Sequence, residues 1–360
     1  TAAGITDRLW SLEDVLATMV ERLSIQFPPR DGVGHNCIFR SGAEIAAEQS
    51  TAVEWVSRPW LARGSITELS GKIKLAGKTT FALHLARGVL GGTPFLGEPT
   101  SQTGVLYLTE QPPVSFRVAM ERAGLLGRDD FVVLEWGQTL GLSWERVGKM
   151  CLDEATRRGI GLLIVDTLPQ FAGLVGDAEN NAGDALIAMR PLQEAAAQGL
   201  AVLVLRHERK SGGDVGDSGR GSSAFGGAVD TVLCLRRPEG NTRETIRLIL
   251  GISRFSEVPS KLLVELVDSE YKTLGTPSQV AAEEARKSIL GAASYSEDEA
   301  LTVEELIRGA QVRRSTAQRI IKELSKTGQL CQIGTGKKGN PFRYFVPEIH
   351  SAQTPPLGGN

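Results

Sequence analysis

The chain has 360 residues, 41% of them hydrophobic, which is enough to bury a large core and suggests a main domain with a smaller one. Its 40 basic and 42 acidic side chains leave a formal charge of −2, so overall charge does not attract nucleic acid and any DNA contact must be local. The absence of a C-x-x-C pair argues against a zinc site or a disulfide framework and favours a reducing cytoplasm. The four cysteines are Cys37, Cys151, Cys234 and Cys331.

The N-terminal part, residues 1–60, is expected to form a helical appendage to the main domain. Apolar residues recur at helical spacing from Leu9 to Ile25, which predicts one amphipathic helix there. The first thirty residues carry charges instead of a secretory apolar segment. No apolar run approaches the ~20 residues that cross a bilayer, so we expect no membrane contact.

Residues 61–275 alternate short apolar runs with helical segments, the pattern of a doubly wound, mostly parallel α/β sheet. A crossover helix is predicted over Ala182–Gln198, with Leu186, Met189, Leu192 and Ala196 on its buried face. The predicted strands are Ile66–Leu69, Val105–Leu108, Phe131–Leu134, Leu162–Val165, Ala201–Leu205, Val229–Leu235 and Thr245–Leu250.

A glycine-rich segment between the first strand and an apolar helix predicts a phosphate-binding loop. Gly71, Gly77, Lys78, Thr79 and Thr80 supply a turn, backbone N–H groups at a helix start, an ammonium and a hydroxyl for Mg²⁺. Five residues separate the two glycines where four are usual, so either the loop is one residue longer or Lys72 takes the place of the first glycine. The alternative is a plain strand, turn and helix with a surface lysine.

Three later strands end in polar residues that belong at the same edge of a parallel sheet. Asp166 follows Leu162–Val165 and is expected to hold Mg²⁺, although an acid there also caps helices. Glu110 follows the second strand and is the candidate base for attack on the γ-phosphate, unless it only caps the segment before Pro112. His207 follows Ala201–Leu205 as a candidate phosphate sensor or a surface histidine.

The C-terminal part, residues 276–350, reads as a polar helical hinge and a small α+β domain, followed by a disordered tail, 351–360. We predict a helix over Leu301–Ile307, a turn at Gly309, a second helix over Arg314–Leu324 and a β-hairpin within Leu330–Phe345. Nine basic and three acidic residues lie between Leu301 and Phe345. The arrangement resembles a winged helix, which binds DNA or docks proteins. Its candidate DNA-binding residues are Arg313, Arg314, Ser315, Thr316, Gln318, Arg319, Lys322, Lys337 and Lys338.

These motifs in this order resemble the RecA/DnaB-type ATPases, and in particular the RepA-like hexameric helicases of plasmids and mobile elements. The resemblance covers about Ile66 to Tyr271. It implies a RecA-like fold, ATP and Mg²⁺ as cofactors, and hydrolysis between the subunits of a homo-oligomer, expected to be a hexamer. The matching segments are 71–80, 107–110, 163–167, 207–213 and 220–224.

The same resemblance implies an arginine that enters the neighbouring subunit's site, for which Gly251-Ile-Ser-Arg254 offers Arg254 but has Ile252 where the family has lysine. It also implies two pore loops, which would be Gly173–Asp184 and Lys210–Ser223 here. The first is acidic and would repel phosphate. The second suits single-stranded DNA, with Arg209, Lys210 and Arg220 as candidate contacts.

Three functions remain open at this stage. The first is an ATP-dependent DNA helicase or translocase that holds a single strand in its pore and duplex at the winged helix. The second is a non-motor ATPase whose nucleotide state switches DNA binding in replication or transcription. The third is a P-loop enzyme that acts on a small molecule, which the winged helix and the RecA-like order of motifs disfavour.

Overall fold

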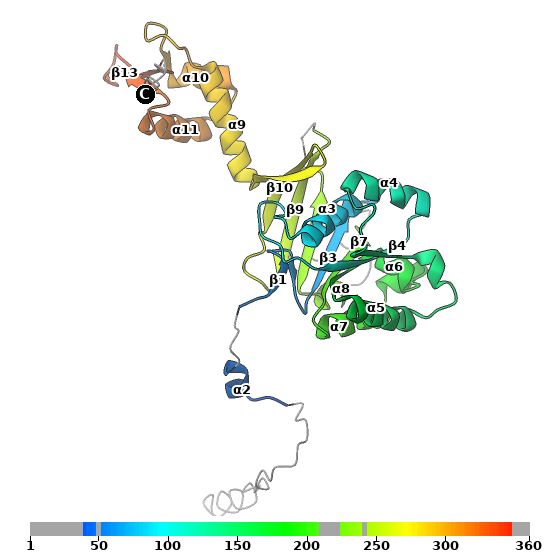
Figure 1. The fold of residues 1–360 in the computed structure, drawn as a ribbon. Helices are drawn as coiled ribbons and strands as arrows, with labels where there is room; N and C mark the ends of the chain where they lie inside the picture. Colours follow the sequence, from blue (N-terminus) through cyan, green and yellow to red (C-terminus); the bar gives the residue numbers. More distant parts are fainter. Residues whose placement is uncertain (1–38, 48–51, 209–223, 240–242, 348–360) are drawn as a thin grey trace, which may run out of the picture. The chain divides into compact units, whose positions relative to one another are not determined.

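The computed structural model describes residues 39–47, 52–208, 224–239 and 243–347 (Figure 1). The helix expected over Leu9–Ile25 and the tail 351–360 lie outside these residues. The chain divides into two units, Thr1–Ala52 and Val53–Asn360. In the first unit, α2 (Gly42–Ala46) begins with a reciprocal cap, in which the Ser41 amide donates to Glu44 and the Glu44 amide donates to the Ser41 hydroxyl. This pairing satisfies two backbone donors at the helix start.

The second unit is built on a nine-stranded sheet in the order β11-β10-β9-β8-β3-β7-β6-β4-β5. The six strands from β8 to β5 are parallel, and β9, β10 and β11 add antiparallel to the β8 edge. The parallel strands are β3 (Ile66–Gly71), β4 (Gly104–Thr109), β5 (Phe131–Glu135), β6 (Ile160–Asp166), β7 (Ala201–His207) and β8 (Thr231–Arg236). The antiparallel strands are β9 (Ile246–Ser253), β10 (Lys261–Val267) and β11 (Glu270–Gly275).

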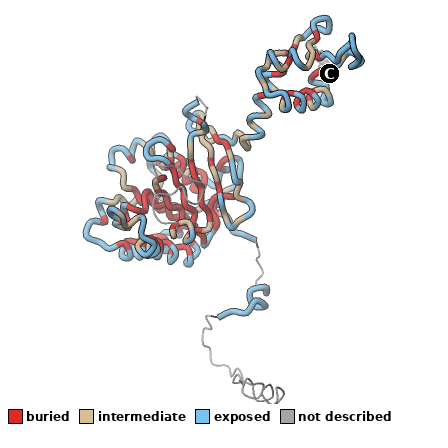
Figure 2. Tube along the Cα trace, turned by 180° about the vertical axis from the view of Figure 1, so that it is seen from behind, coloured by how far each residue is buried: buried red, intermediate tan, exposed pale blue. Residues whose placement is uncertain are grey.

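Helices cover both faces of this sheet and bury it (Figures 1 and 2). Every residue of β3 and β6 is buried, as expected for central parallel strands with apolar side chains on both faces. One apolar cluster joins the sheet to α3 (Lys78–Gly91) and α4 (Pro113–Ala123), and the other joins it to α5 (Trp144–Arg158) and α7 (Ala182–Ala197). The predicted doubly wound, mostly parallel α/β sheet is therefore confirmed, and it matches a RecA-like fold.

Short elements complete this unit. The small sheet of β1 (Trp55–Ser57) and β2 (Leu61–Ala62) precedes β3. The 3-10 helix η1 (Trp136–Thr139) follows β5, and α6 (Leu168–Phe171) and η2 (Gly176–Asn180) lie between β6 and α7. Helix α8 (Ala224–Gly227) precedes β8. Gly173–Asp184, expected to be an open loop, therefore contains η2 and the first turn of α7.

The predicted inner face of α7 is wrong at one position. Met189, Leu192 and Ala196 are buried as expected, but the Leu186 residue is 54% exposed. Ala185 and Ala188 are buried instead. The small alanine side chains let the helix approach its neighbours closely, and the buried stripe is therefore rotated away from Leu186.

The C-terminal module, residues 277–346, has its own hydrophobic core. Ala317, Ile320, Ile321 and Leu324 of the second predicted helix all point into it, as expected. The three strands pair antiparallel in the order β12-β14-β13. The elements are α9 (Pro277–Ala292), β12 (Leu301–Thr302), α10 (Val303–Ala310), α11 (Arg314–Lys326), β13 (Cys331–Ile333) and β14 (Arg343–Phe345).

The turn between α10 and α11 was predicted at the wrong residue. Gly309 lies within α10, and the helix ends at Gln311, which adopts a left-handed conformation with φ of 55°. Glycine usually marks such a C-terminal cap, so the sequence pointed to Gly309. In the module's core, Gly309 instead allows close packing, since a β-carbon there would lie 3.1 Å from that of Ala292. Among the described helices, none is long and apolar enough to span a membrane.

Candidate ATPase site

The predicted phosphate loop connects β3 to α3. Gly71 is the last residue of β3, and Gly77 caps α3 in a left-handed conformation with φ of 81°. Lys72 is thus the first loop residue, with four residues between it and Gly77, which favours the second alternative for the unusual glycine spacing. A β-carbon on Gly71 would lie 2.7 Å from Ala76 Cβ and 2.8 Å from the Leu235 carbonyl oxygen. A side chain at position 71 would therefore push the loop away from β8.

Lys78 starts α3 and folds back over the loop. Its Nζ donates to the Gly71 carbonyl at 2.9 Å and lies 3.4 Å from His207 Nδ1. Burial lowers the pKa of Lys78, and the negative charges of Asp166, Glu110 and Glu208 offset only part of that effect. A buried ammonium is stabilised by an opposite charge at contact distance, and a nucleotide phosphate would supply one.

Asp166 ends β6 beside the phosphate loop, because β6 and β3 both flank β7 in parallel. Its Oδ2 accepts hydrogen bonds from the Thr79 hydroxyl at 2.6 Å and the Tyr107 hydroxyl at 2.8 Å. Burial raises the pKa of Asp166, while these two donors act in the opposite direction. Burial and the neighbouring Asp166 charge also raise the pKa of Tyr107. The carboxylate is therefore fixed in place by two hydroxyl groups.

Glu110 follows β4 and is positioned by the segment after β6. The Thr167 hydroxyl donates to Glu110 Oε2 at 2.6 Å, and the Glu110 amide donates to the Asp166 carbonyl at 2.9 Å. The neighbouring Gln111 side chain donates to Thr79 Oγ1 at 3.2 Å. These contacts hold a carboxylate at the same sheet edge as Lys78.

A cavity of about 590 Å³ lies over this edge. That volume is within the range of small-molecule sites. Lys78, Thr79, Glu110, Asp166 and His207 all line it. They come from the start of α3, the position after β4, and the last residues of β6 and β7. The structure therefore brings together the predicted phosphate-binding, metal-binding and base residues, along with the histidine.

The residues present fit a magnesium ion. Thr79 and Asp166 offer hard oxygen ligands, and the hydroxyl already touches the carboxylate at 2.6 Å. In the described part of the chain, no group of three or more His, Cys, Asp or Glu is placed to bind a metal by itself. Thr79 and Asp166 would thus hold Mg²⁺ together with nucleotide phosphates, and the ion would neutralise phosphate charge.

Arg254 is not in this cavity. It follows β9, whose Ser253 pairs with Thr231, the first residue of β8. Because β8 runs parallel to β3, Arg254 lies where the parallel strands begin, whereas Lys78 lies where they end. Its side chain is 69% exposed, and its guanidinium forms a 2.9 Å ion pair with Asp230. Asp230 also accepts a hydrogen bond from the Ile66 amide at 3.0 Å. Within one subunit, Arg254 therefore cannot contact a nucleotide held by Lys78.

The predicted DNA contacts fall into two groups. Arg209, Lys210 and Arg220 lie outside the described residues. On the C-terminal module, Thr316 is partly buried and the other predicted contacts are exposed. Those exposed residues are Arg313, Arg314, Ser315, Gln318, Arg319, Lys322, Lys337 and Lys338.

Several residues at the site had no role predicted for them. Tyr107 and Thr167 lie in segments that match the family but were assigned no function, and here the Tyr107 hydroxyl donates to Asp166 and the Thr167 hydroxyl donates to Glu110. Arg247 of β9 contacts the loop between β3 and α3, since its Nε donates to the Ala76 carbonyl at 2.8 Å. Only the pairing of strands far apart in the chain brings these side chains to the site.

Comparison with known proteins adds one family match. A family model described as "AAA domain" matches residues 40–213, which include Lys78, Glu110, Asp166 and His207. No curated protein matches the chain. The site geometry and this match support a RecA-like P-loop ATPase that binds and hydrolyses nucleotide.

Two solved structures are similar to part of this chain. A KaiC-like protein from Pyrococcus horikoshii is 14% identical with a TM-score of 0.47, covering 62% of this chain and 99% of that one. A RadB recombinase is 16% identical with a TM-score of 0.43, covering 59% of this chain and 91% of that one.

Proposed function

We propose that the chain is an ATP-dependent DNA motor, a RepA-like helicase or translocase that hydrolyses ATP at the interfaces of a homo-oligomer, expected to be a hexamer. The observation that carries the proposal is the convergence of Lys78, Thr79, Asp166 and Glu110 on one cavity, in a chain that also has a basic C-terminal module. The first feature supports ATP hydrolysis, and the second supports a nucleic acid as the target.

In the proposed reaction, Glu110 accepts the proton of a water molecule whose oxygen attacks the γ-phosphorus. The bond from that phosphorus to the bridging oxygen breaks, and ADP and phosphate are released. The Thr167 hydroxyl, 2.6 Å from Glu110 Oε2, keeps the carboxylate oriented for this step. Lys78 balances negative charge on the phosphates, and His207 lies close enough to respond to their presence.

Arg254 suits a role in the neighbouring subunit's site. Its exposed guanidinium lies at the sheet edge opposite its own phosphate loop, so a second copy could receive it. The ion pair with Asp230 would have to open, and Asp230, whose side chain is 25% exposed, would keep the Ile66 amide as a hydrogen-bond donor. Mixing an Arg254→Ala chain with a Lys78→Met chain tests this role, because some interfaces then combine an intact Lys78 with an intact Arg254. Partial recovery of turnover supports it, and undiminished turnover by Arg254→Ala alone refutes it.

The C-terminal module is proposed to tether the motor to DNA as a winged helix. Helix α11 presents Gln318, Arg319 and Lys322 to solvent, and the hairpin after it carries Lys337 and Lys338. A second helix of this kind can enter the major groove while the hairpin contacts phosphate. The alternative, docking of a protein, would leave DNA affinity unchanged when these residues are replaced.

ATP turnover with and without DNA, followed by strand separation, tests the motor. Single-stranded DNA should raise the turnover of the wild type, and a forked duplex should be unwound only with ATP. Glu110→Gln, which keeps the size of the side chain but cannot accept the proton, should do neither. Nucleotide-dependent DNA affinity without unwinding would instead identify the second candidate, a non-motor switch. Turnover unchanged by DNA, together with a DNA affinity that does not depend on nucleotide, would contradict both.

A further inference from the structure

We propose that a groove on the C-terminal module binds one strand of DNA and stacks an unpaired base on Phe342. The inference rests on the proposed function only in taking DNA as the ligand. It adds a site for an opened strand to a module otherwise expected to bind duplex.

The groove is a cavity of about 740 Å³ between α11 and the β13–β14 hairpin. Gln318, Lys322 and Lys326 line one wall, and their spacing of four residues places them on one face of α11. Gln332 and Phe342 line the hairpin wall. The groove thus offers an aromatic ring, two ammonium groups and two amides.

Phe342 is an unusual residue for the surface of a small domain. It is 41% exposed, although its neighbour Tyr344 is buried in the module's core. The hairpin backbone packs against part of the ring, since a β-carbon on Gly336 would come within 2.6 Å of Phe342 Cε2. Gly336 also adopts a φ of +73°, which favours glycine. The ring is therefore held at the groove wall by a turn that only glycine suits.

The charges around the groove favour a polyanion. Lys322 and Lys326 line it, and Lys337 and Lys338 are exposed on the hairpin. The one acid in the lining, Glu304, is already paired with Arg314 at 3.0 Å.

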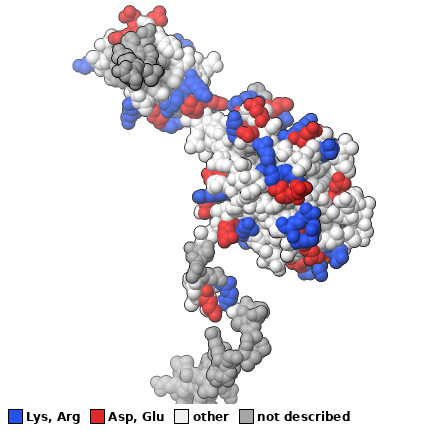
Figure 3. Space-filling view, viewed as in Figure 1, with Lys and Arg blue, Asp and Glu red and all other residues white. Residues whose placement is uncertain are grey.

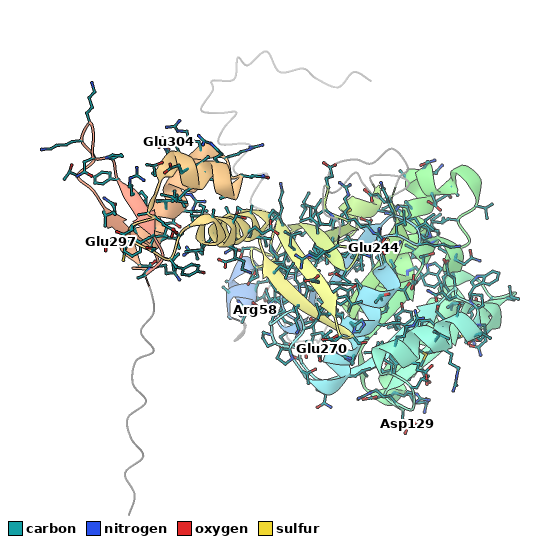
Figure 4. All side chains as sticks on the ribbon, turned by 90° about the horizontal axis from the view of Figure 1, so that it is seen from above. Arg58, Asp129, Glu244, Glu270, Glu297 and Glu304 are labelled. Carbon is teal, nitrogen blue, oxygen red and sulfur yellow. The ribbon has the colours of Figure 1, made fainter. Side chains whose placement is uncertain are left out.

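The acidic residue within α11 is also paired with arginines. Glu323 is the acid within this helix, and it is paired with both Arg286 and Arg319. Basic side chains are visible on the side of the module where α11 lies (Figures 1 and 3), and Glu304 is labelled on α10 in Figure 4. Positive charge in the groove therefore remains available for phosphates.

A single strand fits these features better than a duplex or a protein. Bases within a duplex are stacked on one another and are not free to stack on a side chain. An apolar protein segment would bury Lys322 and Lys326 without partners, at a cost in desolvation. A single strand places phosphates near the lysines and a base on the ring, and its base edges can reach Gln318 and Gln332.

The test compares three variants of the full chain in binding to a labelled single strand and to the matching duplex. Phe342→Leu removes the aromatic ring but keeps an apolar side chain, and it should weaken single-strand binding by about 5- to 100-fold. Phe342→Tyr keeps the ring and should bind as the wild type does. Tyr295→Leu removes another aromatic residue, which is 69% exposed and does not line the groove, and should also have no effect. Duplex affinity should be the same in all.

A second measurement locates the strand, because the main domain is also expected to bind single-stranded DNA. An oligonucleotide with 5-iodouracil, crosslinked to the wild type by light, should attach to the peptide that contains Phe342. A crosslink found only in the main domain overturns the groove, as does equal single-strand binding by Phe342→Leu and the wild type. Equal weakening of duplex and single-strand binding by Phe342→Leu also overturns it.

The failure of this inference is distinct from the failure of the motor. Groove crosslinks with no effect of DNA on ATP turnover would keep the groove and remove the motor. DNA-stimulated turnover that Phe342→Leu leaves unchanged, with no crosslink to the hairpin, would keep the motor and remove the groove.

Discussion

Replacing Lys78 by methionine separates the chemistry of the phosphate site from its contribution to stability. Lys78 is only 7% exposed, and burial lowers its pKa. Methionine has a similar length and no charge, so it removes the ammonium without leaving a large cavity. The Gly71 carbonyl loses one donor but keeps the Glu208 amide at 3.1 Å. The free energy of unfolding of the nucleotide-free protein should therefore stay within about 1 kcal/mol of the wild type, or rise.

ATP turnover should respond very differently to the same change. Losing one preorganised charge at a reacting phosphate is expected to reduce turnover by about 100- to 1,000-fold, or roughly 2.7–4 kcal/mol. Steady-state phosphate release with excess ATP and Mg²⁺ measures turnover, and urea unfolding followed by circular dichroism measures stability. Lys149→Met makes the same chemical change at an exposed position on α5 and should alter neither. Turnover near the wild-type level would refute the phosphate-site assignment, and a large loss of stability would refute the reasoning about the buried charge.

Other changes test the packing and the support of the site. Gly71→Ala should destabilise the fold by about 1–3 kcal/mol in urea unfolding, whereas Gly291→Ala, with nothing within 4 Å, should stabilise α9 by about 0.5–1 kcal/mol; equal effects would contradict the packing at position 71. Met189→Ala should lower the free energy of unfolding by about 2–5 kcal/mol, and Leu186→Ala should lower it by less than about 0.5 kcal/mol. The reverse order would support the buried face of α7 that was predicted from the sequence. Because burial raises the pKa of Asp166, its ionisation destabilises the Mg²⁺-free fold as pH rises through that pKa, and the Tyr107 hydroxyl offsets part of this cost. Tyr107→Phe should thus lower the unfolding free energy by about 1.5–3 kcal/mol at a pH above the pKa of Asp166 and by less below it; a loss independent of pH would argue against this coupling.

The sequence predicted the parts of the fold that depend on local pattern. Apolar runs located the parallel strands, and the pattern of a strand, glycines and an apolar helix placed Gly77 and Lys78 correctly at the start of the helix after β3. Asp166 and Glu110 were found because parallel strands end at a common edge. These inferences need only the composition of each segment and the direction of its neighbours.

Features that depend on pairing between distant segments were not predicted. Two strands of a local hairpin, β10 and β11, were also not predicted, because β11 is largely polar and β10 shows no alternation of buried and exposed residues. The roles of Tyr107 and Thr167 depend on the register of β4 with β6, which places Thr109 opposite Asp166. The exposure of Leu186 depends on how closely α7 packs, which periodicity alone does not determine.

The order of strands in the sheet has a consequence for synthesis of the chain on the ribosome. Lys78 and His207 are 129 positions apart, and β7 lies between β3 and β6 in the sheet. In a nascent chain whose β7 is still inside the ribosome, β3 and β6 therefore lack the strand that lies between them in the sheet. The growing polypeptide cannot consume nucleotide until that strand emerges and inserts.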